Sequence, residues 1–363
     1  MSELDLKLGR IRDLLHEHAL DALLLQRVSN FAWATCGAAS YVNTAVADGA
    51  ASLLFTPSGR YVIADNIEAP RLKLEEGLEA QGWEFCVGPW FEKSRVVADL
   101  AVGLSLGVDG SYPGASDLSS FFPGLRAALT TEEGDRFRVL AKACAAAMDA
   151  AIRSIGPGMT EHEIAGCLAD EATKRGIQPI VDLVGTDERI FRIRHPLPTD
   201  KRLERYAMLV LCGRKWGLVC SITRLIHFGH LPAELRSKSE AVAQVDAHFI
   251  AATRPGRKLC EIFQEAVESY QAAGYADEWR LHHQGGLGGY EPREIVATPE
   301  AEGEVSQGQV YAWNPSITGA KSEDTILVGA HENEILTAVP GWPVMKVEVN
   351  GCVIERPAIL EVG

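Results

Sequence analysis

Histidine side chains that could carry proton-transfer chemistry lie in the second half of the chain. His195 is followed by Pro196, and His283 lies in the glycine-rich run HHQGGLGG over 282–289. An imidazole titrates near neutral pH, so either histidine could accept and return a proton without a large pKa shift. Each could instead be structural, His195 in an ordinary loop and His283 in a bend that the glycines permit.

A single acidic residue, Glu323, opens the strand-like run EDTILV over 323–328. The pattern predicts that the Glu323 side chain points inward. A buried, unpaired carboxylate is costly, so Glu323 needs a partner or a raised pKa. A cationic group, a bound substrate, His195 or His283 would serve as that partner.

Three arginines near these segments could clamp a carboxylate through paired hydrogen bonds: Arg192, Arg194 and Arg224. Ion pairing at the surface is the alternative for at least one of them. The eight cysteines are scattered and form no CxxC pair. They are therefore interpreted as reduced, mostly buried thiols of a cytoplasmic protein.

Charge and hydropathy exclude several classes of partner. The chain has 363 residues and a formal net charge of −14, with no basic stripe. Phosphates demand clustered Lys and Arg, so neither nucleic acid nor an anionic membrane is an expected partner. No apolar run is long enough to span a bilayer, and residues 1–7 lack a basic region followed by an apolar run.

The first third of the chain predicts a small α/β domain. Apolar residues recur at helical spacing over 4–18, and residues 21–25 form a buried strand. Residues 51–55 and 61–64 flank the turn Pro57-Ser58-Gly59, which predicts a hairpin, and another short strand follows over 104–108.

A long helix begins the second part. Thr130 supplies a capping hydroxyl ahead of Glu132 and Glu133, which predicts a helix that runs to about Ile155. Thr160 caps the next helix. We therefore place the domain boundary near 123–130, with domains 1–125 and 126–363.

The ordered set of segments resembles the pita-bread superfamily, peptidase family M24, which includes creatinase, prolidase, aminopeptidase P and methionine aminopeptidase. The similar segments are DALLL over 21–25, SNFAW over 29–33, IGPGMTE over 155–161 and SEDTILV over 322–328. The resemblance implies an α+β fold in which a small α/β N-terminal domain precedes a pita-bread catalytic domain. That catalytic domain would have a curved, mainly antiparallel sheet backed by helices, and relatives with this architecture imply a homodimer.

The metal ligands of the family are largely missing. The resemblance implies two divalent ions held by two Asp, one His and two Glu. The matching positions here carry Val210 or Leu211, then Ser221, His283, Asn314 and Glu323. Two divalent cations need several hard oxygen ligands, so we expect no dinuclear centre and no cofactor.

Two mononuclear alternatives remain. A zinc ion on His283 and Glu323 would lack the usual third protein ligand, and we do not expect one. Substitution by Cys212 and Cys220, which lie beside the lost Asp positions, is the other alternative left open.

Creatinase is the informative relative, because it has lost its metals and still hydrolyses a C–N bond with a histidine as acid and base. His195 occupies the place of that histidine. The creatinase glutamate falls on Thr223, so creatine itself is not the expected substrate. The resemblance thus implies His195, His283 and Glu323 as catalytic residues. The predicted substrate-binding residues are Arg192, Arg194, Ser221, Arg224, Tyr290, Glu291, Asn314 and, from the N-terminal domain of a partner subunit, Tyr41.

Three functions follow. The first is a metal-independent hydrolase that cleaves a C–N bond of a small, polar, nitrogenous substrate. The second is a pseudoenzyme that binds a ligand or peptide, and the third is an Xaa-Pro dipeptidase or aminopeptidase with substituted metal ligands. Convergence of His195, His283 and Glu323 on one site would favour an enzyme, whereas separation beyond roughly 8–10 Å would favour a binding module.

Overall fold

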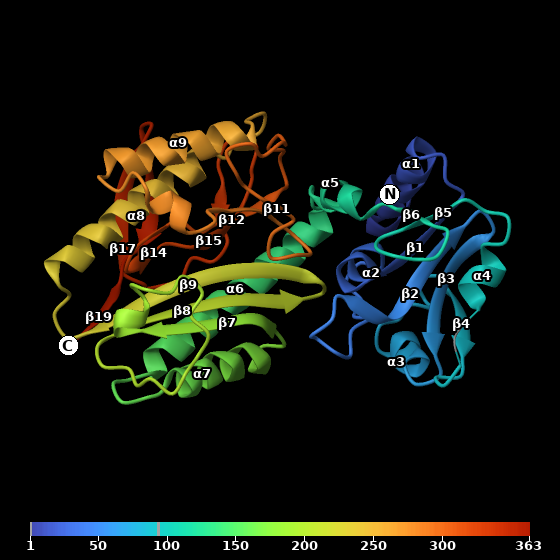
Figure 1. Ribbon diagram of the computed structural model, residues 1–363, viewed down its shortest axis with the longest axis horizontal. Helices are drawn as coiled ribbons and strands as arrows, with labels where there is room; N and C mark the ends of the chain where they lie inside the picture. Colours follow the sequence, from blue (N-terminus) through green and yellow to red (C-terminus); the bar gives the residue numbers. More distant parts are fainter. Residues whose placement is uncertain (1, 93–94) are drawn as a thin grey trace. The chain divides into compact units, whose positions relative to one another are not determined.

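The computed structural model describes residues 2–92 and 95–363 (Figure 1). It divides into two compact units, Met1–Arg126 with Trp216–Leu218, and Ala127–Lys215 with Val219–Gly363. Each unit has a buried apolar cluster of its own. The predicted domains 1–125 and 126–363 lie close to this division, apart from residues 216–218. In the described residues, no helix is long and apolar enough to cross a membrane.

The first unit is built on a six-stranded sheet with strand order β4-β3-β2-β1-β5-β6. The predicted helix, strand and hairpin are present as α1 (Glu3–Glu17), β1 (Ala22–Arg27), and the antiparallel pair β2 (Asp48–Thr56) and β3 (Gly59–Asp65). Its other elements are α2 (Val28–Ala34), α3 (Ala69–Leu74), β4 (Glu84–Gly88), α4 (Val96–Leu100), β5 (Leu106–Val108), β6 (Ser116–Asp117), η1 (Ser119–Phe121) and α5 (Phe122–Arg126). The small α/β domain predicted from the sequence is confirmed.

The second unit begins with the two predicted helices, α6 (Thr131–Ser154) and α7 (Glu161–Lys174). Thr130 and Thr160 cap them, and each helix returns a glutamate side chain, Glu133 or Glu163, to the backbone of its cap. α6 and α7 pack on the sheet β19-β9-β8-β7, as Figure 1 shows. The bounds of its strands are β7 (Gln178–Thr186), β8 (Tyr206–Lys215), β9 (Leu218–Phe228) and β19 (Leu360–Val362), and η2 (Asp187–Arg189) follows β7.

A second sheet, of order β11-β10-β12-β15-β16, completes the pita-bread half of the fold. Its neighbours β10, β12 and β15 pair antiparallel. The remaining elements are α8 (Ala233–Ala252), α9 (Leu259–Ala272), η3 (Glu278–Leu281), β10 (Gly285–Gly288), β11 (Ile295–Val296), β12 (Val310–Trp313), β13 (Ser316–Ile317), β14 (Ala320–Lys321), β15 (Asp324–Leu327), β16 (Glu334–Ile335), β17 (Val344–Val349) and β18 (Cys352–Pro357). The α+β prediction with an antiparallel catalytic sheet and helical backing is confirmed.

The two sheets meet where β9 approaches the start of β15. Thr223 and Glu323 form an isolated antiparallel bridge there. Two residues further along, the Ser221 amide donates to Thr325 Oγ1 at 3.1 Å, and Thr325 Oγ1 donates to the Ser221 carbonyl at 2.8 Å. This junction brings residues from both sheets together although about a hundred positions separate them in the sequence.

Candidate active site

Three imidazoles form the centre of the site. His195 comes from the loop between η2 and β8, and His282 and His283 connect η3 to β10. The Nε2 atoms of His195 and His282 are 3.0 Å apart, and the ring centroids of His195 and His283 are 5.5 Å apart. His195 and His283 are exposed, whereas His282 is buried. The site therefore presents two reachable imidazoles supported by a third.

Glycines hold the two adjacent histidines in place. Gly285 has φ +96°, and a Cβ at this position would lie 2.1 Å from the carbonyl oxygen of Ala312. Only glycine permits β10 to pair with β12 at this distance. The glycine-rich run thus allows the backbones of β10 and β12 to approach closely. This pairing fixes the start of β10 at Gly285, shortly after His283.

The three imidazoles are neutral at physiological pH. Burial lowers the pKa of His282 to about 2. Burial, followed by the charges of Arg293 and Lys321, lowers the pKa of His283 to about 4. Burial and Lys321 also lower the pKa of His195 below its usual value. A lowered pKa weakens an imidazole as a base, so His282 is a poor proton acceptor, whereas His195, which is more exposed, is the better candidate base.

Glu323 is fully enclosed and held by cations. Its Oε1 accepts from Arg293 Nη2 at 2.9 Å, its Oε2 lies 2.9 Å from Lys321 Nζ, and Thr223 donates its hydroxyl to Oε2. Burial alone would raise the pKa of Glu323, but Lys321 and Arg293 outweigh burial and lower the pKa to about 2. Of the partners that the sequence left open for Glu323, the structure supplies cationic groups, Lys321 and Arg293.

Sequence reasoning missed both of these cations. A signal for Lys321 was available, because residues two apart on a strand share a face, and Lys321 precedes Glu323 by two. No spacing rule points to Arg293. The chain folds back after β10, where the Glu294 amide donates to the Leu287 carbonyl, and this turn brings Arg293 to Glu323.

Ser221 belongs to the same cluster. Its hydroxyl accepts from Arg293 Nη1 at 3.0 Å and lies 3.3 Å from the sulfur of Cys212. Burial raises the pKa of Cys212 to about 11. The other candidate thiol, Cys220, contacts Thr325 Oγ1 instead, at 3.7 Å. Cys212, on β8, contacts Ser221, whereas Cys220 is the neighbour of Ser221 on β9 and therefore points to the opposite face. The two thiols do not meet at one ion.

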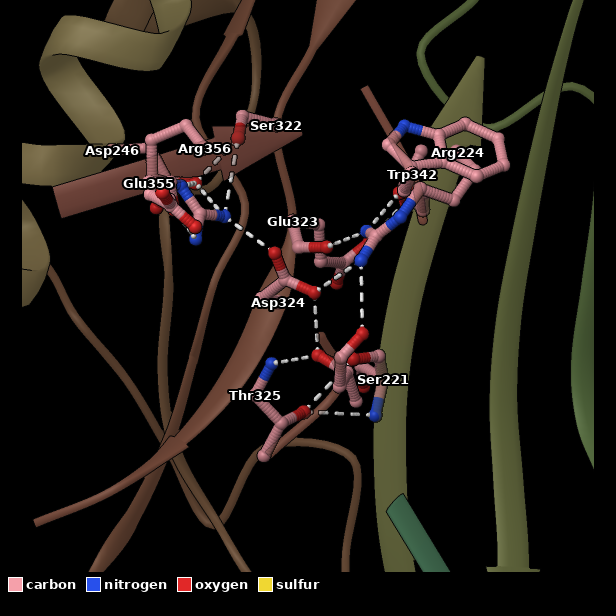
Figure 2. A network of polar contacts seen from close by, with 12 residues as sticks. Ser221, Arg224, Asp246, Ser322, Glu323, Asp324, Thr325, Trp342, Glu355 and Arg356 are labelled. Atoms are coloured by element: carbon pink, nitrogen blue, oxygen red, sulfur yellow. Dashed lines mark hydrogen bonds and ion pairs between the residues drawn. The ribbon is translucent and has the colours of Figure 1, made fainter. Parts of the chain in front are cut away.

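Arg224 takes part in a different network (Figure 2). Its Nη2 donates to Asp324 Oδ1 at 2.8 Å, and Asp324 Oδ2 accepts from Arg356 at 2.7 Å. Arg356 also pairs with Asp246, at 2.6 Å. These four residues are buried and join β9, β15, β18 and α8. The structure thus gives the Arg224 guanidinium an internal carboxylate partner, away from the histidines.

The other predicted substrate-binding residues are dispersed. Tyr290 donates to Glu133 Oε1 at 2.6 Å and is buried. Arg194 pairs with Glu278 at 2.5 Å and reaches Ser316 Oγ at 3.3 Å, and that hydroxyl lies 3.3 Å from His282 Nδ1.

Asn314 is buried, and its Oδ1 has no hydrogen-bond partner. Arg192 is exposed, Glu291 is half-buried, and Tyr41 is half-buried in the first unit.

The donor set does not fit a dinuclear metal centre. Val210 is buried in the apolar cluster, and both oxygens of Glu323 accept from protein donors. Among the described residues, the one group with metal-ligand chemistry is His195, His282 and His283, whose candidate ligand atoms lie within 4.8 Å of one another. That group offers three imidazole nitrogens, which is the donor set of a single zinc ion and not of a dinuclear centre that needs carboxylates. The nearby charges of Lys321 and Arg293 oppose a divalent cation there.

Comparisons with known proteins agree on family and fold. Residues 135–330 match the family described as metallopeptidase family M24. An Xaa-Pro dipeptidase of Pyrococcus furiosus is 26% identical over 308 residues, which cover 77% of this chain and 87% of that protein. A crystallised Xaa-Pro dipeptidase from Bacillus anthracis superimposes with a TM-score of 0.79 at 18% identity, covering 99% of this chain and 100% of that one.

The curated relatives also include an uncharacterised peptidase of Staphylococcus epidermidis, 27% identical over 188 residues. That match covers 50% of this chain and 54% of the relative, so the chain spans about half the length of this relative.

Proposed function

The chain belongs to metallopeptidase family M24, and on this premise we propose that it is a metal-independent hydrolase that cleaves a C–N bond of a small, polar, nitrogenous molecule. One observation carries the proposal. His195, His282 and His283 converge on one site, with the ring centroids of His195 and His283 5.5 Å apart and the Nε2 atoms of His195 and His282 3.0 Å apart. A module that only binds a ligand has no need of a reachable neutral base at this place.

His195 is the proposed acid and base. When its Nε2–H donates to His282 Nε2, His282 must carry its own proton on Nδ1, where Ser316 Oγ accepts it at 3.3 Å. This arrangement leaves Nδ1 of His195 free to take a proton from water and to return it to the leaving nitrogen. His282 and Ser316 act as positioning residues that select the tautomer of His195.

His283 and Glu323 have supporting roles in this proposal. His283 is exposed and neutral and can donate or accept a hydrogen bond to the substrate. Glu323 cannot accept a proton from water, because Lys321, Arg293 and Thr223 occupy its oxygens. It instead fixes the positions of the two cations.

The test is hydrolysis by the purified full chain of a panel of dipeptides, N-acylated amino acids and guanidino acids. For any substrate turned over, His195→Ala should lower kcat/KM by about 10²- to 10⁴-fold, the usual contribution of a general acid–base residue. His331→Ala, at an exposed histidine of the same unit, is the control. Thermal unfolding should be unchanged in both variants, and a chelator should leave the activity intact.

The second candidate is an Xaa-Pro dipeptidase that retains metal through substituted ligands. The similarity to the Pyrococcus furiosus enzyme favours it. Elemental analysis decides between the two. About two equivalents of a divalent metal per chain, with activity lost on chelation, would replace the metal-independent proposal. A homodimer and a cytoplasmic location stay predictions.

A further inference from the structure

We propose that Lys321 and Arg293 supply the positive charge that two divalent ions supply in metal-bearing members of the family, and that this cationic centre binds a carboxylate group of the substrate. The inference rests on the proposed function, because it assigns a substrate class to the same site.

The two cations contact residues at positions that the family uses for metal ligands. Arg293 bridges two of them, with Nη1 3.0 Å from Ser221 Oγ and Nη2 2.9 Å from Glu323 Oε1. Lys321 Nζ lies 2.9 Å from the other oxygen of Glu323. The side chains of Lys321 and Glu323 are only 5% and 2% exposed, so water screens this charge cluster weakly.

The charge of the centre does not balance. Lys321 and Arg293 bring two positive charges, and Glu323, which both contact, brings one negative charge. The adjacent carboxylate, Asp324, pairs with Arg224 and Arg356 on the other side of the strand. A mostly buried excess of one positive charge is unfavourable unless an anion offsets it.

Both cations have donors left for that anion. An ammonium has three N–H donors, and in the described part of the chain Lys321 contacts one acceptor, Glu323. The Nε of Arg293 is buried without a hydrogen-bond partner. A small recess is lined by Lys321, His282, Arg194, Ser316 and the four apolar residues Ile190, Ile193, Met208 and Ala320. A single carboxylate oxygen that enters this recess would accept from Lys321 and lie beside His282.

Acetate is the probe for the test, and the full chain is titrated while the histidine ring signals are followed by NMR. Lys321→Gln and Arg293→Gln should each weaken acetate binding by about tenfold or more. Glu323→Gln removes the competing negative charge and should tighten binding by a similar factor. Lys142→Gln, at an exposed lysine of α6, is the matched control and should leave binding unchanged.

The conservative variant Lys321→Arg keeps the charge and should retain binding, which guards against a loss caused by misfolding. Unchanged acetate affinity in folded Lys321→Gln, or weaker binding in Glu323→Gln, would overturn the inference. The inference would also be overturned if the purified full chain held two tightly bound zinc ions and Glu323→Gln released them. If acetate binds as expected while His195→Ala has no effect on hydrolysis, only the proposed function fails.

Discussion

At the scale of single residues, the neighbours of a side chain decide its role more than its type does. Glu323 is inward-facing and cation-paired, as the sequence required, but the pairing removes it from acid–base chemistry. Arg224 is also paired with a carboxylate, and that carboxylate is Asp324 of its own chain. The Arg224–Asp324 pair joins positions 100 apart and the Arg293–Glu323 pair joins positions 30 apart, which residue type and local spacing do not encode.

Asp182 provides a prediction that concerns one side chain outside the site. It lies in β7 opposite Leu211, its Oδ1 has no hydrogen-bond partner, and burial raises its pKa from 3.8 to about 7. Between pH 3.8 and about 7, Asp182 therefore keeps its proton in the folded chain, whereas the same side chain has lost its proton in the unfolded chain. The resulting stabilisation is complete below the unfolded pKa and is lost as pH rises through about 7.

Replacing Asp182 with Asn should consequently raise the free energy of unfolding at pH 8 by about 1–3 kcal/mol, the usual cost of a buried group without a partner. At pH 4 the change should be small, because the aspartate is protonated in the folded chain. Urea unfolding at both pH values measures the difference, with the exposed Asp200→Asn as control. An equal gain at both pH values would refute the role of charge.

At the scale of elements, local signals located the helices well and the sheet junction poorly. The hydroxyl-to-glutamate spacing at Thr130 and Thr160 predicted both helix starts, because a capping box is made within four residues. The meeting of β9 with β15 joins Ser221 to Thr325 and has no local signature. The family resemblance alone indicated that these segments share a site.

The buried ion network of Arg224, Asp324, Arg356 and Asp246 should dominate the cohesion of these elements (Figure 2). Arg356 is fully buried between two carboxylates, so Arg356→Met leaves both without their shared cation. We expect a loss of about 3–5 kcal/mol in the free energy of unfolding.

The matched control is Arg236→Met. Arg236 pairs with Glu361 at 2.6 Å, but the two side chains are 47% and 36% exposed. Its loss should cost at most about 1 kcal/mol. Urea unfolding compares the two variants, and similar costs would mean that the buried network contributes no more than a surface ion pair.

At the scale of the whole molecule, each of the two units has an apolar cluster of its own among the described residues. One cluster lies entirely within 22–115 and the other entirely within 127–359. Apolar periodicity, Pro123-Gly124 and the cap at Thr130 predict a boundary near residues 123–130, since each domain is expected to bury its own core. Where the charged residues of the second unit meet depends on its tertiary fold, so Lys321 and Arg293 became visible only in the structure.

The last prediction follows from the distribution of the site over the chain. His195, His282, His283, Arg293, Lys321 and Glu323 all lie in the second unit. A fragment of residues 127–363 should therefore fold around its own core and bind acetate within about threefold of the affinity of the full chain. Circular dichroism and thermal unfolding establish its folding, and NMR titration measures the affinity. A folded fragment without acetate binding would mean that the first unit completes the site, as the resemblance implied for Tyr41. Tyr41→Phe in the full chain would then have to weaken binding as well.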